Sequence, residues 1–144
     1  MFKRILVPTD GSEITLKAVD TCVGLAQSLG AQVFTISVKE PFPYSAISEM
    51  QPTPPQEFFD AQERIAAQRV KAVIEQCRAV GVTCEGHTVE ALHPWEAIID
   101  HAKTLECDLL VMASHGRRGV SALLLGSETQ KVLTHSKVPV LIVR

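Results

Sequence analysis

The sequence predicts a single α/β domain built on a doubly wound sheet of five parallel strands. Short runs of branched apolar residues alternate along the chain with longer segments whose apolar residues recur every three or four positions. Strict alternation of strands and helices is typical of a parallel sheet with helices on both faces. A length of 144 residues is enough for one domain with a sizeable core.

The predicted strands are short runs rich in apolar residues. Three of them are almost continuously apolar, as expected where helices cover both faces of a sheet: residues 5–7, 109–112 and 138–143. Two others, residues 31–38 and 82–89, alternate more strongly between apolar and polar side chains. All five are predicted to lie in one sheet because helical patterns separate them along the chain.

The first two helices are predicted over residues 13–29 and 56–80. In the first, the apolar residues form one stripe: Ile14, Ala18, Cys22, Leu25 and Leu29. Gly30 follows as the predicted C-cap, because helices often end at a residue with a left-handed backbone. In the second helix, one face carries Phe59, Ala66, Val70, Val73 and Cys77, with Gly81 after it.

The third helix is predicted to begin near Pro94, since proline suits the first turn of a helix. Its apolar face carries Trp95, Ile98, Ile99 and Ala102. The fourth is predicted to begin at Ser127, where Ser-Glu-Thr-Gln fits the S-x-x-Q capping box. Residues 39–55 contain five prolines and exceed an ordinary connection in length, which predicts a flexible loop.

Composition and charge exclude several classes of protein. The net charge of −2 argues against a nonspecific nucleic-acid binder, which carries a basic excess. The apolar runs are all shorter than the ~20 residues of a membrane span, so no membrane partner is expected. The apolar stretch at the N-terminus is too short for a signal peptide, so we expect a cytoplasmic protein. The cysteines form no CxxC pair and are expected as buried thiols in a reducing compartment: Cys22, Cys77, Cys84 and Cys107.

Two segments are predicted to meet at the rim of the sheet where the parallel strands end. They are residues 8–12, after the first strand, and residues 113–129, after the fourth. Gly116 and Gly119 permit close backbone approach and positive φ. At Gly126 and Ser127, the first N–H groups of the fourth helix would face an anion. Positive charge near a phosphate would come from His115, Arg117 and Arg118.

Other interpretations of these residues are open. Ser127 is equally suited to be an ordinary N-cap, and Asp10 to cap the first helix with Glu13 as its capping-box partner. Arg117 and Arg118 also fit a solvated loop tip. The chain contains neither G-x-x-x-x-G-K-[ST] nor a G-x-G-x-x-G after the first strand, which argues against kinase-like or dinucleotide-dependent chemistry.

Several stretches resemble the universal stress protein family. They are KRILVPTDGS at the start, VKEPFP after the second strand, HPWEAIIDHA in the third helix, and CDLLVMASHGRRGVSALLLGSETQKVLTHSKVPVLIV near the end. The resemblance spans essentially the whole chain. It implies a five-stranded Rossmann-like sheet and a homodimer that pairs through the last strand, residues 139–143, which as an edge strand has unpaired backbone groups.

The family has a branch that binds ATP and carries G-x2-G-x9-G-[ST], and a branch without this motif that binds no nucleotide. Here the spacing, Gly116, Gly126 and Ser127 match, but Ala113 replaces the first glycine. One extra methyl group matters if that position needs positive φ or close contact with the ribose, and otherwise costs little.

By position, the resemblance puts adenine against the Val38 backbone and near Pro8. Asp10 would lie beside the ribose and phosphates, with a divalent metal such as Mg2+ as an option. Glu128 is compatible with a triphosphate if its N–H faces the ligand and its carboxylate points to solvent. The implied binding residues are Pro8, Thr9, Asp10, Val38, Met112, Ala113, Ser114, His115, Gly116, Arg117, Arg118, Gly119, Gly126, Ser127, Glu128 and Thr129.

The expected function is therefore that of a cytoplasmic, dimeric stress-response protein that binds ATP, or AMP or ADP, and responds to its occupancy. Two alternatives remain. One is an interaction protein of the same family that binds no nucleotide, and the other is a slow ATP hydrolase. Asp10 is the only obvious acid at the rim, so no strong catalytic group is predicted.

Overall fold

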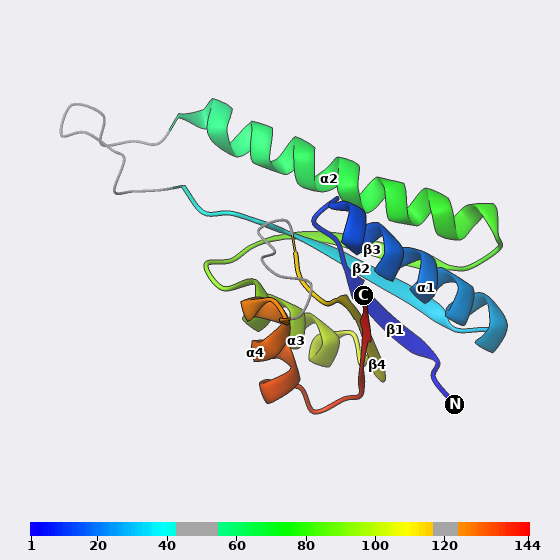
Figure 1. Cartoon of the computed structure of the whole chain (residues 1–144). Coiled ribbons are helices and arrows are strands. Elements are labelled where there is room, and N and C mark those ends of the chain that lie inside the picture. The colour runs from blue at the N-terminus through cyan, green and yellow to red at the C-terminus, as the bar shows by residue number, and fades with distance from the viewer. Residues whose placement is uncertain (43–54, 117–123) are drawn as a thin grey trace.

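A computed structural model of the chain describes residues 1–42, 55–116 and 124–144. Strands and helices alternate along these residues, as the sequence predicts (Figure 1). The strands are β1 (Arg4–Pro8), β2 (Gln32–Lys39), β3 (Cys84–Glu90), β4 (Leu109–Ala113) and β5 (Val140–Val143). The helices are α1 (Glu13–Leu29), α2 (Gln56–Ala79), α3 (Pro94–Thr104) and α4 (Ser127–His135).

The five strands form one parallel sheet in the order β3-β2-β1-β4-β5, which confirms the predicted doubly wound α/β fold. The chain moves outward from β1 through β2 to β3, then crosses to β4 on the other side of β1. The strand order thus reverses between β1 and β4. In open parallel sheets, ligands bind in the crevice that forms beyond the strand ends at such a point.

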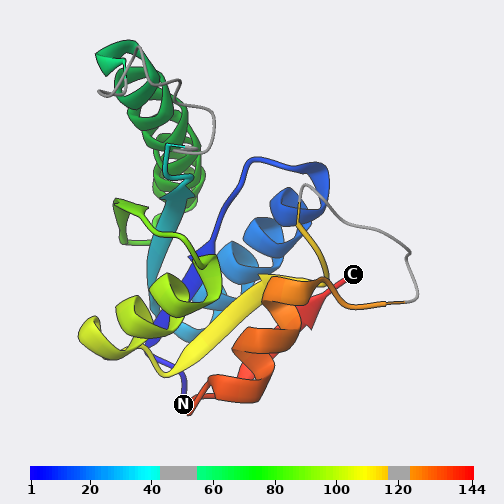
Figure 2. The same ribbon diagram turned by 90° about the vertical axis from the view of Figure 1, so that its left-hand side faces the viewer.

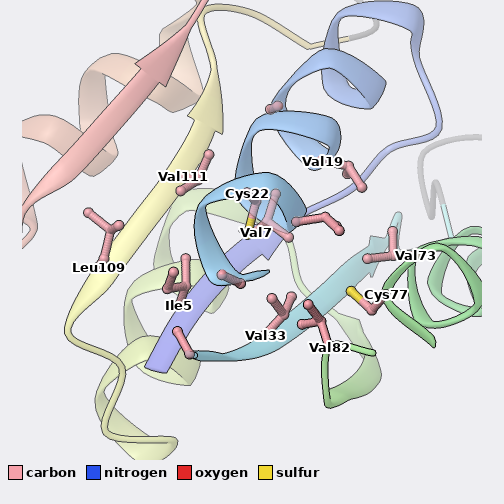
Figure 3. Close-up of a cluster of buried hydrophobic side chains, with 14 residues drawn as sticks. Ile5, Val7, Val19, Cys22, Val33, Val73, Cys77, Val82, Leu109 and Val111 are labelled. Carbon is pink, nitrogen blue, oxygen red and sulfur yellow. The ribbon is translucent and has the colours of Figure 1, made fainter. Parts of the chain in front are cut away.

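Helices cover both faces of this sheet, with α1 and α2 on one face and α3 and α4 on the other (Figures 1 and 2). Successive residues of β1 point to opposite faces, so Ile5 and Val7 enter one core while Leu6 enters the other. Figure 3 shows the first core, where residues of β1, β2 and β4 meet Val19 and Cys22 of α1. The nearly continuous apolar runs are explained by this two-sided burial.

The face that α1 buries differs in part from the predicted stripe. Ala18 and Cys22 are buried as predicted, whereas Leu25 is half-buried and Leu29 is 41% exposed. The buried positions of α1 are Thr15, Ala18, Val19, Cys22, Val23 and Ala26. The side chains buried on this face are small or β-branched, and the larger Leu25 and Leu29 lie at its margin. The helix ends as predicted, at Gly30 with φ 65°.

Other boundaries differ from the prediction by small shifts. α2 ends at Ala79, one residue early, with Gly81 at φ 77° just after it. β3 begins at Cys84 and β5 at Val140, each two residues later than predicted. Of the predicted loop at 39–55, residues 43–54 lie outside the described residues. Within the part of the chain that is described, no helix is both long and apolar enough to cross a membrane.

The cysteines are free thiols, and three of them are buried: Cys22, Cys77 and Cys107. Cys84 is half-buried. Burial raises the pKa of the Cys22 thiol to about 12, so this side chain stays protonated at neutral pH. It therefore packs as a small apolar group, as the sequence indicates.

Candidate functional site

The loops that follow β1 and β4 meet at the β1/β4 crevice, as predicted. Their contact is close at Gly116, where a Cβ atom would lie 2.9 Å from Asp10 Oδ2. The φ of Gly116 is not positive, so only the close approach that a glycine permits is used here. Glycine is favoured here because a Cβ atom would force the Asp10 carboxylate to shift, and not because of the backbone conformation.

Asp10 shapes the first of these loops but does not cap α1. The N-cap is Ser12, whose Oγ accepts a hydrogen bond from the Thr15 N–H at 3.4 Å. Asp10 Oδ1 accepts from the Ser12 N–H at 2.9 Å and from the Thr15 hydroxyl at 2.7 Å. The proposed Asp10–Glu13 capping box is therefore wrong. Asp10 instead holds the loop with one carboxylate oxygen and turns the other towards Gly116.

The N-terminus of α4 closes the other side of the crevice. Its N-cap is Gly126, so Ser127 is the first helical residue and the predicted Ser127 cap and capping box are wrong. The Gly126 N–H donates to the Ser114 carbonyl at 2.8 Å, which places the helix start beside the end of β4 (Figure 2). A Cβ atom on Gly126 would lie 3.0 Å from His115 Cα. Gly126 has no side chain to cap α4, and the first N–H groups of the helix have no partner within the helix itself.

Ala113, the departure from the family motif, is an ordinary strand residue. It is the last residue of β4 and pairs with Val143, and its φ lies outside the left-handed region. Its methyl group packs against the core cluster that contains α1. Its carbonyl accepts a hydrogen bond from the hydroxyl of Thr129, which is 3% exposed, at 3.0 Å. An alanine here needs no strained backbone.

Val38 lies near the end of β2, at a level that β1 does not reach. Ile36 pairs with Pro8, and its carbonyl accepts the Thr9 N–H at 2.9 Å, the last bond between these strands. Hydrogen-bonding groups of a parallel strand face its two neighbours in alternation. The N–H and C=O of Val38 therefore point past the end of β1, into the crevice.

The remaining predicted residues surround the crevice or support it. Thr9 and Ser114 are buried, and the Ser114 N–H donates to the Val143 carbonyl at 2.8 Å. The Ser114 hydroxyl lies 3.2 Å from His115 Nδ1. Met112 is buried in the core beneath α3 and α4, so its side chain supports the sheet. Three predicted residues lie outside the described part of the chain: Arg117, Arg118 and Gly119.

Glu128 differs from the expectation in the direction of its side chain. Its carboxylate does not point to solvent. Oε2 accepts a hydrogen bond from the Trp95 N–H, in the first turn of α3, at 2.9 Å. The carboxylate of Glu128 is thus directed to α3. It does not occupy the crevice that the start of α4 borders.

Sequence reasoning missed Arg69 of α2. Gly11 has φ 75°, and a Cβ atom on it would lie 3.2 Å from Arg69 Nε and 3.3 Å from its Cγ. The arginine side chain therefore lies flat against the loop that carries Asp10, and brings a positive charge to the rim. No motif links position 69 to this loop, because only the packing of α2 on the sheet brings them together.

The described residues form no preformed metal centre. Among residues 1–42, 55–116 and 124–144, no group of three or more His, Cys, Asp and Glu side chains could hold a metal ion. An open hollow of about 440 Å³ lies along α4 and shares only Ser127 with the predicted site. Within the described residues, the candidate site is defined by the loop after β1, the start of the loop after β4 and the start of α4.

Comparison with known proteins shows the family and the fold of this chain. The profile of the Universal stress protein family matches residues 1–144. A universal stress protein of Thermus aquaticus is 33% identical, and the match covers 100% of both chains. The solved universal stress protein UspA from Lactobacillus plantarum has the same fold, with a TM-score of 0.82 at 23% identity over 99% of this chain and 98% of that chain.

A second solved structure is a universal stress protein in complex with cAMP. It matches with a TM-score of 0.73 at 26% identity, over 99% of this chain and 97% of that chain. The full-length profile match and the relative from Thermus aquaticus both point to one family. This chain belongs to the universal stress protein family.

Proposed function

We propose that this chain is a nucleotide-responsive stress protein that binds ATP, or AMP or ADP, in the crevice between the β1 loop and the start of α4. Adenine would lie against the Val38 backbone and near Pro8. The ribose and phosphates would lie between Asp10, the loop that begins at Ala113 and the first turn of α4. A relative of the same fold has been solved with an adenine nucleotide, cAMP, which supports the choice of ligand class.

The observation that carries the proposal is the ordinary strand geometry of Ala113. It is the one position where the chain departs from the ATP-binding motif, its φ lies outside the left-handed region, and its partly buried side chain packs against the core. At the two motif glycines that are described, Gly116 and Gly126, a Cβ atom would lie 2.9 Å from Asp10 Oδ2 and 3.0 Å from His115 Cα, so a side chain would force a neighbour to shift. The close approach that this motif requires is therefore preserved, and alanine does not disturb it.

The phosphates would bind chiefly to backbone groups. The N–H groups of residues 127–129 are not bonded within the first turn of α4, and the helix dipole adds partial positive charge. Arg69 would add a full positive charge at the rim. A divalent cation such as Mg2+ would offset the remaining charge of a triphosphate, with Asp10 as its candidate ligand. We propose binding as the activity, with ATP hydrolysis at most weak.

Calorimetry with ATP and Mg2+ tests this function, using protein stripped of copurified nucleotide. We expect saturable heat with a dissociation constant in the micromolar range, which corresponds to a binding free energy of about −8 kcal/mol. Ala113→Gly should change this constant by less than about threefold, because the methyl group does not face the ligand. GTP in place of ATP provides the matched ligand control for adenine recognition.

No heat at near-millimolar ATP would contradict the proposal and favour an interaction protein that binds no nucleotide. A large gain in affinity in Ala113→Gly would instead show that the methyl group hinders binding. Phosphate release in the same samples separates binding from turnover. Release well above background that is lost in Asp10→Asn would favour the hydrolase.

We also propose a homodimer that pairs through residues 139–143. β5 lies at the edge of the sheet, so one side of its backbone is not paired within the sheet. Leu141 on this strand is 38% exposed. An apolar edge strand of this kind offers backbone hydrogen bonds and apolar contact to a second copy.

Leu141→Asp is expected to convert the dimer to a monomer in analytical ultracentrifugation, because a buried charge in each copy would lie in the interface. Leu29→Asp is the matched control, since Leu29 is 41% exposed at the far end of α1. A wild-type protein that sediments as a monomer at high micromolar concentration would contradict the proposed dimer, as would a Leu141→Asp dimer of unchanged stability.

A further inference from the structure

Glu128 makes a contact that no feature of the sequence indicates. Its Oε2 accepts the Trp95 N–H at 2.9 Å. The first N–H groups of a helix have no partner within it, and Trp95 carries the first of them in α3 because Pro94 has none. His93, the N-cap of α3, makes no side-chain cap, so this N–H needs a partner from elsewhere. The partial positive charge at the start of α3 also stabilises the carboxylate. Glu128 of α4 thus serves as the missing cap of α3.

The first turn of α4 is held from two sides. On the sheet side, the Thr129 hydroxyl donates to the Ala113 carbonyl at 3.0 Å, and the Gly126 N–H to the Ser114 carbonyl at 2.8 Å. On the other side, the Glu128 carboxylate ties the same turn to α3. The N–H groups of residues 127–129 lie between these attachments, so their direction depends on both.

The last turn of α4 is attached to the same part of α3. The rings of Trp95 and His135 stack with centroids 4.4 Å apart and an interplanar angle of 28°. The His135 Nδ1 atom lies 2.8 Å from the Lys131 carbonyl, which fixes the ring on its own helix. Trp95 therefore contacts α4 near both of its ends, by its backbone at Glu128 and by its ring at His135.

We infer that Glu128 is a positioning residue of the nucleotide site and not a ligand: its carboxylate anchors the first turn of α4 on α3, so that the N–H groups of residues 127–129 keep the direction that phosphates require. This inference rests on the proposed nucleotide function. The negative charge next to a triphosphate is tolerated because the carboxylate lies against the start of α3. What the site needs from Glu128 is an acceptor of sufficient reach, and not its charge.

Three substitutions separate reach from charge. Glu128→Gln keeps the length and an acceptor oxygen but removes the charge. Glu128→Asp keeps the charge but is one methylene too short, and Glu128→Ala lacks both. Glu96→Ala is the matched control, because Glu96 is an exposed acid in the first turn of α3. The ligands are MgATP and adenosine, which share the base and ribose but differ in the phosphates.

Calorimetry on the full chain should show that Glu128→Ala and Glu128→Asp weaken MgATP binding by about tenfold. Their affinity for adenosine should change by less than about twofold, since adenosine does not use the start of α4. Glu128→Gln and Glu96→Ala should bind both ligands like the wild type. In amide hydrogen exchange, the Trp95 N–H should lose protection in the Ala and Asp variants and keep it in Gln.

Several results would overturn the inference. One is unchanged MgATP affinity in both Glu128→Ala and Glu128→Asp. Another is an equal loss for MgATP and adenosine, which would indicate general damage to the fold. A Gln variant as weak as Ala would show that the charge matters. Each of these requires a wild type that binds MgATP, whereas a wild type that binds neither ligand would contradict the proposed function itself.

Discussion

Gly126→Val is expected to reduce the affinity for ATP by at least about a hundredfold. A Cβ atom at position 126 would lie 3.0 Å from His115 Cα and 3.2 Å from its Cβ, and the two γ-carbons of valine would crowd the same backbone further. The start of α4 must therefore move away from the end of β4. Several charge-assisted hydrogen bonds from the N–H groups of α4 to phosphate would be lost together.

The matched control for this prediction is Gly24→Val. Gly24 lies in α1, where a Cβ atom would meet nothing within 4 Å, so ATP affinity should be unchanged. Thermal unfolding of both variants establishes that they are folded at the temperature of the calorimetry. If a folded Gly126→Val protein binds ATP as the wild type does, the phosphates do not lie at the start of α4.

Gly86→Ala is expected to lower the free energy of unfolding by about 2 kcal/mol, the usual cost of forcing extra volume into a packed interface. Gly86 lies in β3 beneath α2. A Cβ atom there would overlap Val70 Cγ1 and would lie 3.0 Å from Ile74 Cδ1. Both neighbours belong to α2. The helix must therefore move away from the sheet, or the side chains of Val70 and Ile74 must leave their preferred rotamers.

Urea unfolding followed by circular dichroism measures this effect, with Gly24→Ala as the control. Gly24→Ala should be neutral or stabilise the protein by up to about 1 kcal/mol, since glycine is unfavourable inside a helix and the site is open. The two variants make the same chemical change with opposite expected signs. A Gly86→Ala protein as stable as the wild type would show that α2 packs at a greater distance from β3.

Much of the fold could be predicted because the information is local. Branched apolar runs are suited to strands buried on both faces, and the stripe of α2 from Ala66 to Cys77 needs only helical geometry to face the sheet. Gly30 and Pro94 have their predicted roles because the conformations that they favour do not depend on distant residues. The parallel order then follows from the strict alternation of the elements.

The candidate site could be predicted in outline, because parallel strands bring the loops after β1 and β4 to one rim. The caps could not be assigned in the same way. Asp10 and Ser12 are both good N-cap residues, and local sequence does not say which one the backbone uses. The N-cap of α4 is Gly126 and not the predicted Ser127, because the tight contact with His115 places Gly126 at the turn into the helix.

By itself, the sequence determined the family, the alternation of strands and helices, and the rim where the glycine motif lies. All of these depend on residue type and spacing along the chain. Only the tertiary structure decided that the Ala113 methyl packs against the core, that Glu128 caps α3 and that Arg69 covers Gly11. Each of these is a contact between elements distant in sequence. Their partners are set by how helices pack on the sheet, which no local pattern specifies.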